Sequence, residues 1–474
     1  MTIIRLVLLG IQAVVLCIAT LSGVAAAEKD RPNIIIIMTD NLGYGDLGVY
    51  GGMRAPTPRI DKFAAEGVRF RDFQVEPKCT PTRAALMTGR LPIRSGIHSV
   101  DVPGEPGGLH PKEITLAELL KDAGYRTALF GKWHIGEAPE RQPQNQGFDE
   151  FMGMLNVMLP PDPSSPGYDG KFAEINPIIS VEKGGKPEKL ADMDINYRGR
   201  FDSDITDKSV AYIRKHSKSG QPFFLWVSFT NPHHPVIPHP HFAGKSGGGA
   251  YADVLMEIDF NTGRVLDAIN KSGIKDDTIV VWMSDNGPTM YSEPDQNGDP
   301  GPWTGQLGST WEGGLRTAGM MRWPKRIKAN WISDEIFHVL DLNVTLATLA
   351  GAKVPQDRPV DGIDQSDYLL GKQANSNRDH SIIFDNGQLA AVRWRQFKIH
   401  FIKHDKEQGI MEVNTPHQVP NVFNLRTDPK ERHNMTGNKG GGFTFLFPVM
   451  NKVVGPYMKS FQQYPHADYS KFEN

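Results

Sequence analysis

Short apolar runs alternate with segments of helical periodicity along most of this chain, and this alternation restricts the fold more than any other feature. Residues 34–38 form a β-branched run without a polar side chain, typical of a strand that is buried on both faces. Further strand-like runs lie at residues 125–130, 222–229 and 278–284. Strands that alternate with helices predict an α/β fold, with a large central and mostly parallel sheet flanked by helices.

The pattern changes near residue 375, where short strand-like runs follow one another without helices between them. These runs are found at residues 381–384, 389–392, 397–401 and 422–425. A helical segment follows at residues 448–461. We therefore expect a large domain at residues 28–375 and a smaller C-terminal subdomain at residues 376–474, built of an antiparallel sheet and one helix.

The first 27 residues have the parts of a secretory signal peptide. Arg5 precedes an apolar run at residues 6–24, and three alanines at residues 25–27 provide a small-residue cleavage site. An uncleaved membrane anchor is the alternative, although Gly10 and Gln12 interrupt the apolar run. No later stretch approaches the ~20 apolar residues of a membrane-spanning helix. We expect an exported protein, periplasmic or secreted, without stable membrane insertion.

The charge balance argues against a strongly charged partner. The chain has 52 basic and 54 acidic residues, which gives a formal net charge of −2. Because nucleic-acid binding needs an excess of basic residues on one surface, we expect no nucleic-acid partner.

Cys79 is one of two cysteines, and the other, Cys17, lies in the expected signal peptide. A single thiol in an exported protein cannot close an intramolecular disulfide, so it is either incidental or chemically used. Pro81 suits a first helical turn, and Gly89 suits a helix end. Cys79 is therefore expected at a helix N-terminus, where backbone N–H groups favour an anion, with Arg83 on the same helical face.

Polar residues follow several of the predicted strands, where the carboxyl ends of parallel strands form the ligand-binding edge of a sheet. Asp40-Asn41 and Asp285-Asn286 each come directly after a buried strand, and their oxygens suit Ca²⁺ or Mg²⁺. Asp and Asn are also common turn formers, which is the alternative for either pair alone.

Three more polar residues follow strands. Lys132 can neutralise an anion, and His134 is two residues further on and titrates near neutral pH, as a general base does. A solvated lysine and a structural histidine are the alternative. His233 lies between Pro232 and a second histidine, His234, which could take its place.

The sequence Cys79-x-Pro81-x-Arg83, followed by Thr88-Gly89-Arg90, resembles the maturation signature of the type I sulfatases of the alkaline phosphatase superfamily. The resemblance implies an arylsulfatase-like enzyme of alkaline phosphatase-like fold. It also implies that a formylglycine-generating maturation enzyme oxidises Cys79 to Cα-formylglycine. The resemblance covers nearly the whole chain after residue 27, including the small C-terminal subdomain.

Roles for the polar residues follow from the same resemblance. The implied catalytic residues are Cys79, Arg83, Lys132, His134 and His233. The implied ligands of Ca²⁺, or of Mg²⁺, are Asp40, Asn41, Asp285 and Asn286, together with the modified Cys79.

The implied reaction is the hydrolysis of sulfate monoesters of a small molecule or a glycan, through a metal-bound formylglycine diol at position 79. One hydroxyl of the diol attacks sulfur, His233 protonates the leaving oxygen, and a covalent sulfoenzyme intermediate forms. His134 then deprotonates the second hydroxyl, which releases sulfate and restores the aldehyde. Loops at residues 155–200, 236–250 and 288–308 are expected to select the substrate.

The chain departs from the family pattern at two positions. Many members have a second aspartate where this chain has Asn41, which should weaken the binding of a divalent cation. The family often has a lysine five residues before the glutamate of Glu-Gly-Gly, and this chain has Leu307 there. Two alternatives therefore stay open: a phosphonate monoester or phosphodiester hydrolase of the same superfamily, and a catalytically silent glycan-binding relative.

Overall fold

The computed structural model describes residues 31–101, 107–156, 177–290, 296–403, 415–436 and 442–465. The expected signal peptide at residues 1–27 lies outside the described residues. Within the described residues, no helix is both long enough and apolar enough to cross a membrane.

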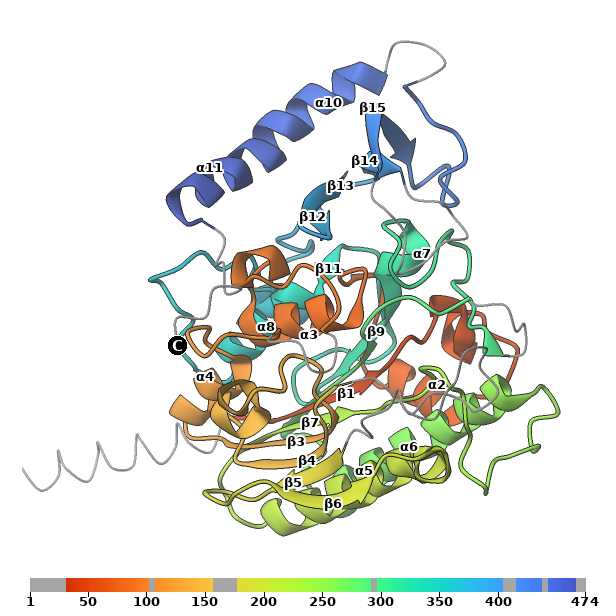
Figure 1. The fold of residues 1–474 in the computed structure, drawn as a ribbon, viewed down its shortest axis with the longest axis vertical. Helices are drawn as coiled ribbons and strands as arrows, with labels where there is room; N and C mark the ends of the chain where they lie inside the picture. Colours follow the sequence, from red (N-terminus) through yellow and green to blue (C-terminus); the bar gives the residue numbers. More distant parts are fainter. Residues whose placement is uncertain are drawn as a thin grey trace, which may run out of the picture.

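An eleven-stranded sheet forms the centre of the large domain (Figure 1). Its strands are β1 (Asn33–Thr39), β2 (Val68–Gln74), β3 (Arg126–Lys132), β4 (Glu150–Met154), β5 (Pro177–Val181), β6 (Glu188–Asp192), β7 (Phe223–Ser228), β8 (Thr278–Ser284), β9 (Arg316–Arg322), β10 (Trp331–Ser333) and β11 (Phe337–His338). The order is β10-β2-β9-β8-β1-β7-β3-β4-β5-β6, and β11 also pairs with β2. The five central strands β8-β1-β7-β3-β4 are all parallel, which confirms the predicted sheet.

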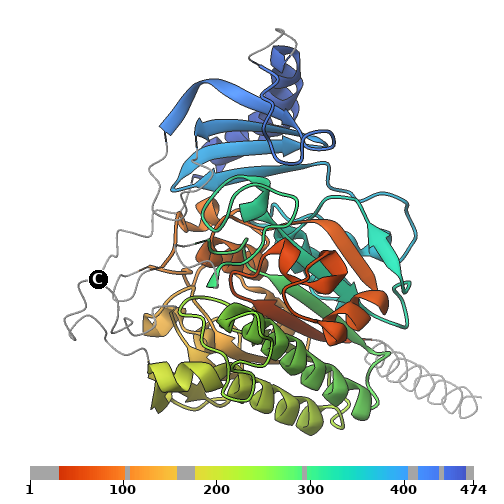
Figure 2. The same ribbon diagram turned by 90° about the vertical axis from the view of Figure 1, so that its right-hand side faces the viewer.

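Helices cover both faces of this sheet (Figures 1 and 2). They are needed there because β1 presents apolar side chains to both faces of the sheet. Ile35 and Ile37 pack with α2 (Pro58–Ala65), α5 (Ile195–His216) and α6 (Ala250–Lys271) on one face. Ile34 and Ile36 pack on the other face with α3 (Cys79–Thr88), α4 (Leu116–Asp122) and α8 (Val339–Leu349). Each fully buried isoleucine contributes about 1.5–3 kcal/mol of hydrophobic stabilisation.

The C-terminal subdomain is a four-stranded antiparallel sheet that lies at one end of the large domain (Figure 2). Its strands are β12 (His380–Asp385), β13 (Gln388–Trp394), β14 (Phe397–Lys403) and β15 (Thr415–Asn424). One face of the sheet packs on a continuous helical segment made of α10 (Gly442–Val449), a π-helical turn (Met450–Val454) and α11 (Gly455–Gln463). The predicted antiparallel sheet with a helix is confirmed.

Composition predicts a surface insertion at residues 155–200, and the described part from residue 177 onward differs from this prediction. Residues 177–192 form the hairpin β5–β6, which extends the central sheet at its edge, and α5 begins at Ile195. The side chains of β6 are exposed or half-buried, so this edge strand lacks the apolar periodicity by which strands are recognised.

Two further short helices are α7 (Glu312–Leu315) and α9 (Ser366–Leu369). Buried ion pairs link the subdomain to the large domain. Arg393 of β13 binds both carboxylate oxygens of Asp72 on β2, and Lys398 of β14 donates to Glu312 of α7 at 2.9 Å. All four side chains are at most 8% exposed. Because a buried charge without a partner is costly, these pairs fix how the two parts pack.

Replacing Arg393 with Met should lower the free energy of unfolding by about 3–5 kcal/mol, because Asp72 would stay buried and lose its bidentate partner. Arg395→Met is the matched control, since Arg395 is on the next turn and its side chain is 63% exposed. The control should change stability by less than about 1 kcal/mol. Chemical denaturation of both variants measures this, and equal losses would contradict the importance of the buried pair.

Candidate active site

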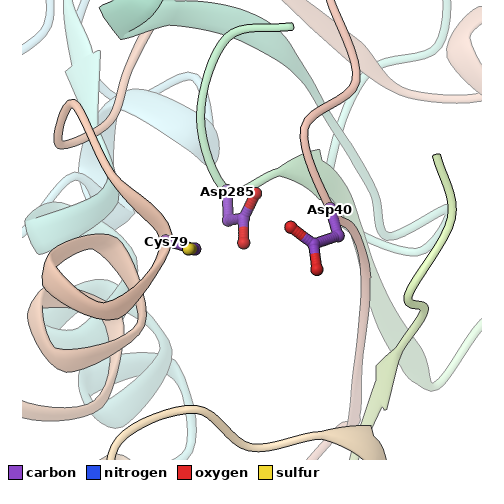
Figure 3. A group of neighbouring side chains, drawn as sticks. All are labelled: Asp40, Cys79 and Asp285. Carbon is purple, nitrogen blue, oxygen red and sulfur yellow. The ribbon is translucent and has the colours of Figure 1, made fainter. Parts of the chain in front are cut away.

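The carboxyl ends of four neighbouring parallel strands bring the predicted polar residues together. Asp40 follows β1, Asp285 follows β8, Lys132 ends β3, and His233 lies in the loop after β7. Because the order of these strands is β8-β1-β7-β3, their carboxyl ends lie side by side at one edge of the sheet. The N-terminus of α3, which begins with Cys79, reaches the same edge (Figure 3).

The helix that carries Cys79 has the ends that the sequence predicts. Gly89 ends α3 in the left-handed conformation, with φ of 67°. The residue before the helix, Lys78, has an extended backbone and does not cap the first turn with its side chain. Cys79 is a free thiol, and its side chain is 2% exposed.

Two carboxylates surround this thiol. One oxygen of Asp40, one oxygen of Asp285 and the sulfur of Cys79 all lie within 4.8 Å of one another (Figure 3). The buried atoms Asp40 Oδ1 and Asn286 Oδ1 have no hydrogen-bond partner among the described residues. Unpartnered oxygens beside two carboxylates fit a hard divalent cation such as Ca²⁺ or Mg²⁺, and a thiol is the wrong donor for that set. An oxygen-bearing group at position 79 would complete it.

Each carboxylate of the group also has a buried cation as partner. Lys132 Nζ lies 2.6 Å from Asp40 Oδ2. Arg83 donates from Nε and Nη2 to Asp285 Oδ2, at 3.1 and 2.8 Å. Arg83 also donates from Nη1 to the backbone carbonyl of Lys132 and to the hydroxyl of Ser228. The guanidinium therefore joins α3 to the ends of three strands and holds Asp285 in place.

Asn41 belongs to the same cluster, and its amide is bound to that of Asn286. Its backbone has φ of 66°, and its N–H donates to Asp285 Oδ1 at 3.1 Å. The side-chain oxygen of Asn41 accepts from Asn286 Nδ2 at 2.6 Å, so Asn286 keeps its own oxygen for another partner. The structure thus brings together the four Asp and Asn residues that the sequence predicts as metal ligands, next to Cys79, the fifth.

The two candidate acid–base histidines both donate a ring N–H to a backbone carbonyl, which fixes the tautomer of each neutral ring. His134 Nε2 lies 3.1 Å from the carbonyl oxygen of Asp101, so Nδ1 is the bare nitrogen. This Nδ1 is buried and has no hydrogen-bond partner in the described part of the chain. His233 Nδ1 lies 2.7 Å from the carbonyl oxygen of His234, which leaves Nε2 to exchange a proton.

Burial shifts the pKa values of the groups in this cluster. It raises the pKa of the Cys79 thiol to about 11, so the thiol is protonated at neutral pH. Burial, and then the charge of Lys132, hold the pKa values of His134 and His233 well below their usual range. Both imidazoles are therefore neutral in this arrangement. Burial, and then the charge of Arg198, lower the pKa of His234.

Leu307 is buried close to the cluster. It is 4% exposed and belongs to none of the apolar clusters that the described residues form. Its N–H donates to the carbonyl of Pro288, and the N–H of Gly308 donates to the carbonyl of Pro77. Leu307 therefore lies between the turn that follows Asp285 and the turn that precedes Cys79, in the region where the family pattern has a cation.

Two charged residues of α5 support the loop that carries His233, and sequence reasoning missed both. Arg198 donates to the carbonyl of His233 at 3.0 Å and to the side chain of Asn231 at 2.7 Å. Asp202 accepts from the backbone N–H groups of Thr230 and Asn231. The only sign of them in the sequence was their spacing of four residues, which puts both side chains on one face of a helix, next to its apolar face.

Comparison with known proteins agrees with this geometry. The family model described as "Sulfatase" matches residues 32–352, and the model described as "C-terminal region of aryl-sulfatase" matches residues 376–471. The chain is 35% identical to N-acetylgalactosamine-6-sulfatase of Canis lupus familiaris over 86% of this chain and 82% of the relative. It is 34% identical to arylsulfatase A of Homo sapiens over 92% of this chain and 89% of the relative.

A solved structure has the same fold over nearly its whole length. The crystal structure of PsFucS1 sulfatase from Pseudoalteromonas sp. superposes with a TM-score of 0.85 and 32% identity, covering 95% of this chain and 94% of that chain. The family models, the curated relatives and the solved structure therefore agree along both parts of the molecule. The chain belongs to the sulfatase family and is a sulfuric ester hydrolase.

Proposed function

We propose that this enzyme hydrolyses sulfate monoesters with a Cα-formylglycine made from Cys79 by a maturation enzyme. The observation that carries the proposal is the position of Cys79, a protonated and buried thiol within 4.8 Å of two carboxylate oxygens. A thiol in these surroundings is neither an activated nucleophile nor a suitable ligand for a hard cation. The intact sequence Cys79-x-Pro81-x-Arg83 provides the substrate for its oxidation.

The residues around position 79 fit a divalent cation, which we propose to be Ca²⁺, with Mg²⁺ as the alternative. Asp40, Asp285 and Asn286 would hold it with their buried oxygens, and Asn41 completes the group of four. When bound, the cation would supply positive charge for the sulfate, and the hydrated aldehyde would supply the attacking oxygen.

The residues of the chain itself have the following proposed roles. Lys132 and the N-terminus of α3 stabilise negative charge on the sulfate group. His233 passes a proton to the leaving oxygen through Nε2, because Nδ1 already donates to a carbonyl; the neutral ring must first take up this proton, which the negative charge of a bound sulfate ester favours. His134 accepts a proton at its bare Nδ1. Arg83 holds Asp285 in position rather than contacting the substrate, since four of its N–H donors are already used.

Sulfated glycans are the substrate class that we propose. One curated relative is named for a sulfated amino sugar, and the C-terminal subdomain contacts the residue before Cys79 through Asp385. The signal peptide that the sequence predicts at residues 1–27 would bring the enzyme to an extracellular or periplasmic glycan. A phosphonate monoester or phosphodiester substrate is the nearest alternative, but the family membership favours sulfate.

Cys79→Ala should abolish the hydrolysis of para-nitrophenyl sulfate, by about 10³-fold or more, because no other group can supply the attacking oxygen. Parallel assays of para-nitrophenyl sulfate and a phenyl phosphonate monoester, with protein from its native host, measure the reaction and its preference. Thermal unfolding of the variant is the control for its fold. Faster turnover of the phosphonate, or activity that survives the substitution, would contradict the proposal.

His233→Gln should reduce kcat/KM by about 10²–10⁴-fold for an alkyl sulfate, whose leaving group needs a proton, and much less for para-nitrophenyl sulfate. His234→Gln is the matched control, because the Nδ1 of His234 interacts with the hydroxyl of Thr289 instead. We expect a smaller loss for His234→Gln, equal for both substrates. The dependence of kcat/KM on the leaving group decides between the two histidines, and a steeper dependence for His234→Gln would reverse the assignment.

A further inference from the structure

The turn between β12 and β13 brings the C-terminal subdomain to the start of α3. This turn has no role in the proposed mechanism. Lys78, the residue directly before Cys79, is 1% exposed. Its Nζ lies 2.7 Å from Asp385 Oδ1 and donates to Asn386 Oδ1 at 2.9 Å. Because Asp385 is also buried, this ion pair fixes the turn against the residue next to position 79.

The segment at residues 98–101 connects this turn to the catalytic histidine. The hydroxyl of Ser99 lies 3.4 Å from Lys78 Nζ. Asp101 donates its N–H to the hydroxyl of Thr80, and its carbonyl oxygen lies 3.1 Å from His134 Nε2. The turn, the start of α3 and His134 are therefore joined by direct contacts. The β12–β13 turn lies at the rim of the site.

The outer part of this rim is exposed, polar and uncharged. Asn386 and Gln388 on the turn are exposed, and so is His98. His98 lies against the turn, because a Cβ added to Gly387 would be only 3.2 Å from Nδ1 of His98. Gln388 is directly opposite Asp385 in the β12–β13 register, so both side chains leave the same face of the sheet, the face toward α3. The positive charge of Lys78 is neutralised by Asp385 underneath.

We propose that His98, Asn386 and Gln388 form a saccharide subsite beside the sulfate-binding end of α3, and that it takes an uncharged, hydroxyl-bearing sugar ring. This inference rests on the proposed sulfatase function. Side-chain amides both donate to and accept from sugar hydroxyls, as does an imidazole. A ring with a further sulfate or carboxylate would need a cation to replace its hydration, and the side-chain amides of Asn386 and Gln388 carry no charge.

The test compares substrates on variants of the rim. The probes are para-nitrophenyl sulfate, a set of monosulfated oligosaccharides with an uncharged neighbouring ring, and the same oligosaccharides with a second sulfate on that ring. We expect Gln388→Ala and His98→Ala each to raise KM for the best monosulfated oligosaccharide on the order of tenfold, the loss of about one good hydrogen bond. The ratio of its kcat/KM to that of para-nitrophenyl sulfate should fall by the same factor. Gln388→Lys should shift the preference toward the disulfated oligosaccharide.

Gln396→Ala is the matched control, because Gln396 is in the turn at the other end of β13. It should leave both substrates unaffected. An unchanged ratio in Gln388→Ala and His98→Ala, or a wild-type preference for the disulfated oligosaccharide, would overturn the subsite and leave the sulfatase function intact. Absence of turnover with every sulfate ester would overturn the proposed function itself, and the subsite with it.

Discussion

Two buried carboxylates can lie next to each other in this protein because each one is paired with its own cation. Asp40 and Asp285 are both fully buried, and in isolation their charges would repel and would be poorly solvated. Lys132 binds the first at 2.6 Å and Arg83 binds the second at 2.8 Å, so the four charged groups together are neutral. Among the described residues, one oxygen of Asp40 has no hydrogen-bond partner, and this carboxylate lies next to Cys79. The rest of the site depends on this balance, because it allows oxygens to stay available in a region that excludes water.

The site needs both parts of the molecule. The parallel strands place Asp40, Lys132 and Asp285 at one edge of the sheet, which is the contribution of the large domain. The C-terminal subdomain holds the residue before Cys79 through Asp385, and it holds the loop that contains Leu307 through its contacts with Glu312. Its β12–β13 turn is therefore in contact with the start of α3, directly before Cys79.

Sequence reasoning predicted the elements whose signals are local. β1 and β8 are continuous apolar runs, and α3 has a proline in its first turn and a glycine at its end, so each could be recognised alone. The site residues were found because they follow such strands and because the Cys79 sequence is distinctive. The edge strand β6 was missed because its exposed side chains remove the apolar periodicity, and without it the short run of β5 had no partner to indicate a hairpin.

Residues that act through long-range contacts could not be predicted. Arg198 and Asp385 lie far along the chain from the groups that they hold, and nothing in their own surroundings in the sequence marks them as buried. Asn41 and Leu307 could be recognised as departures from a family pattern, but only the structure shows their contacts. Asn41 joins the amide of Asn286, and Leu307 lies between the turns next to Asp285 and Cys79.

Mass spectrometry of the tryptic peptide of residues 79–83, from protein made in its native host, shows directly whether Cys79 is oxidised to formylglycine. The account predicts a peptide in which an aldehyde group, CHO, replaces the CH₂SH side chain of Cys79, and in which an aldehyde-reactive probe labels the same residue. An unmodified thiol in all of the protein, from a host shown to modify other sulfatases, would contradict the account. The oxygen-rich cluster around position 79 would then need another explanation.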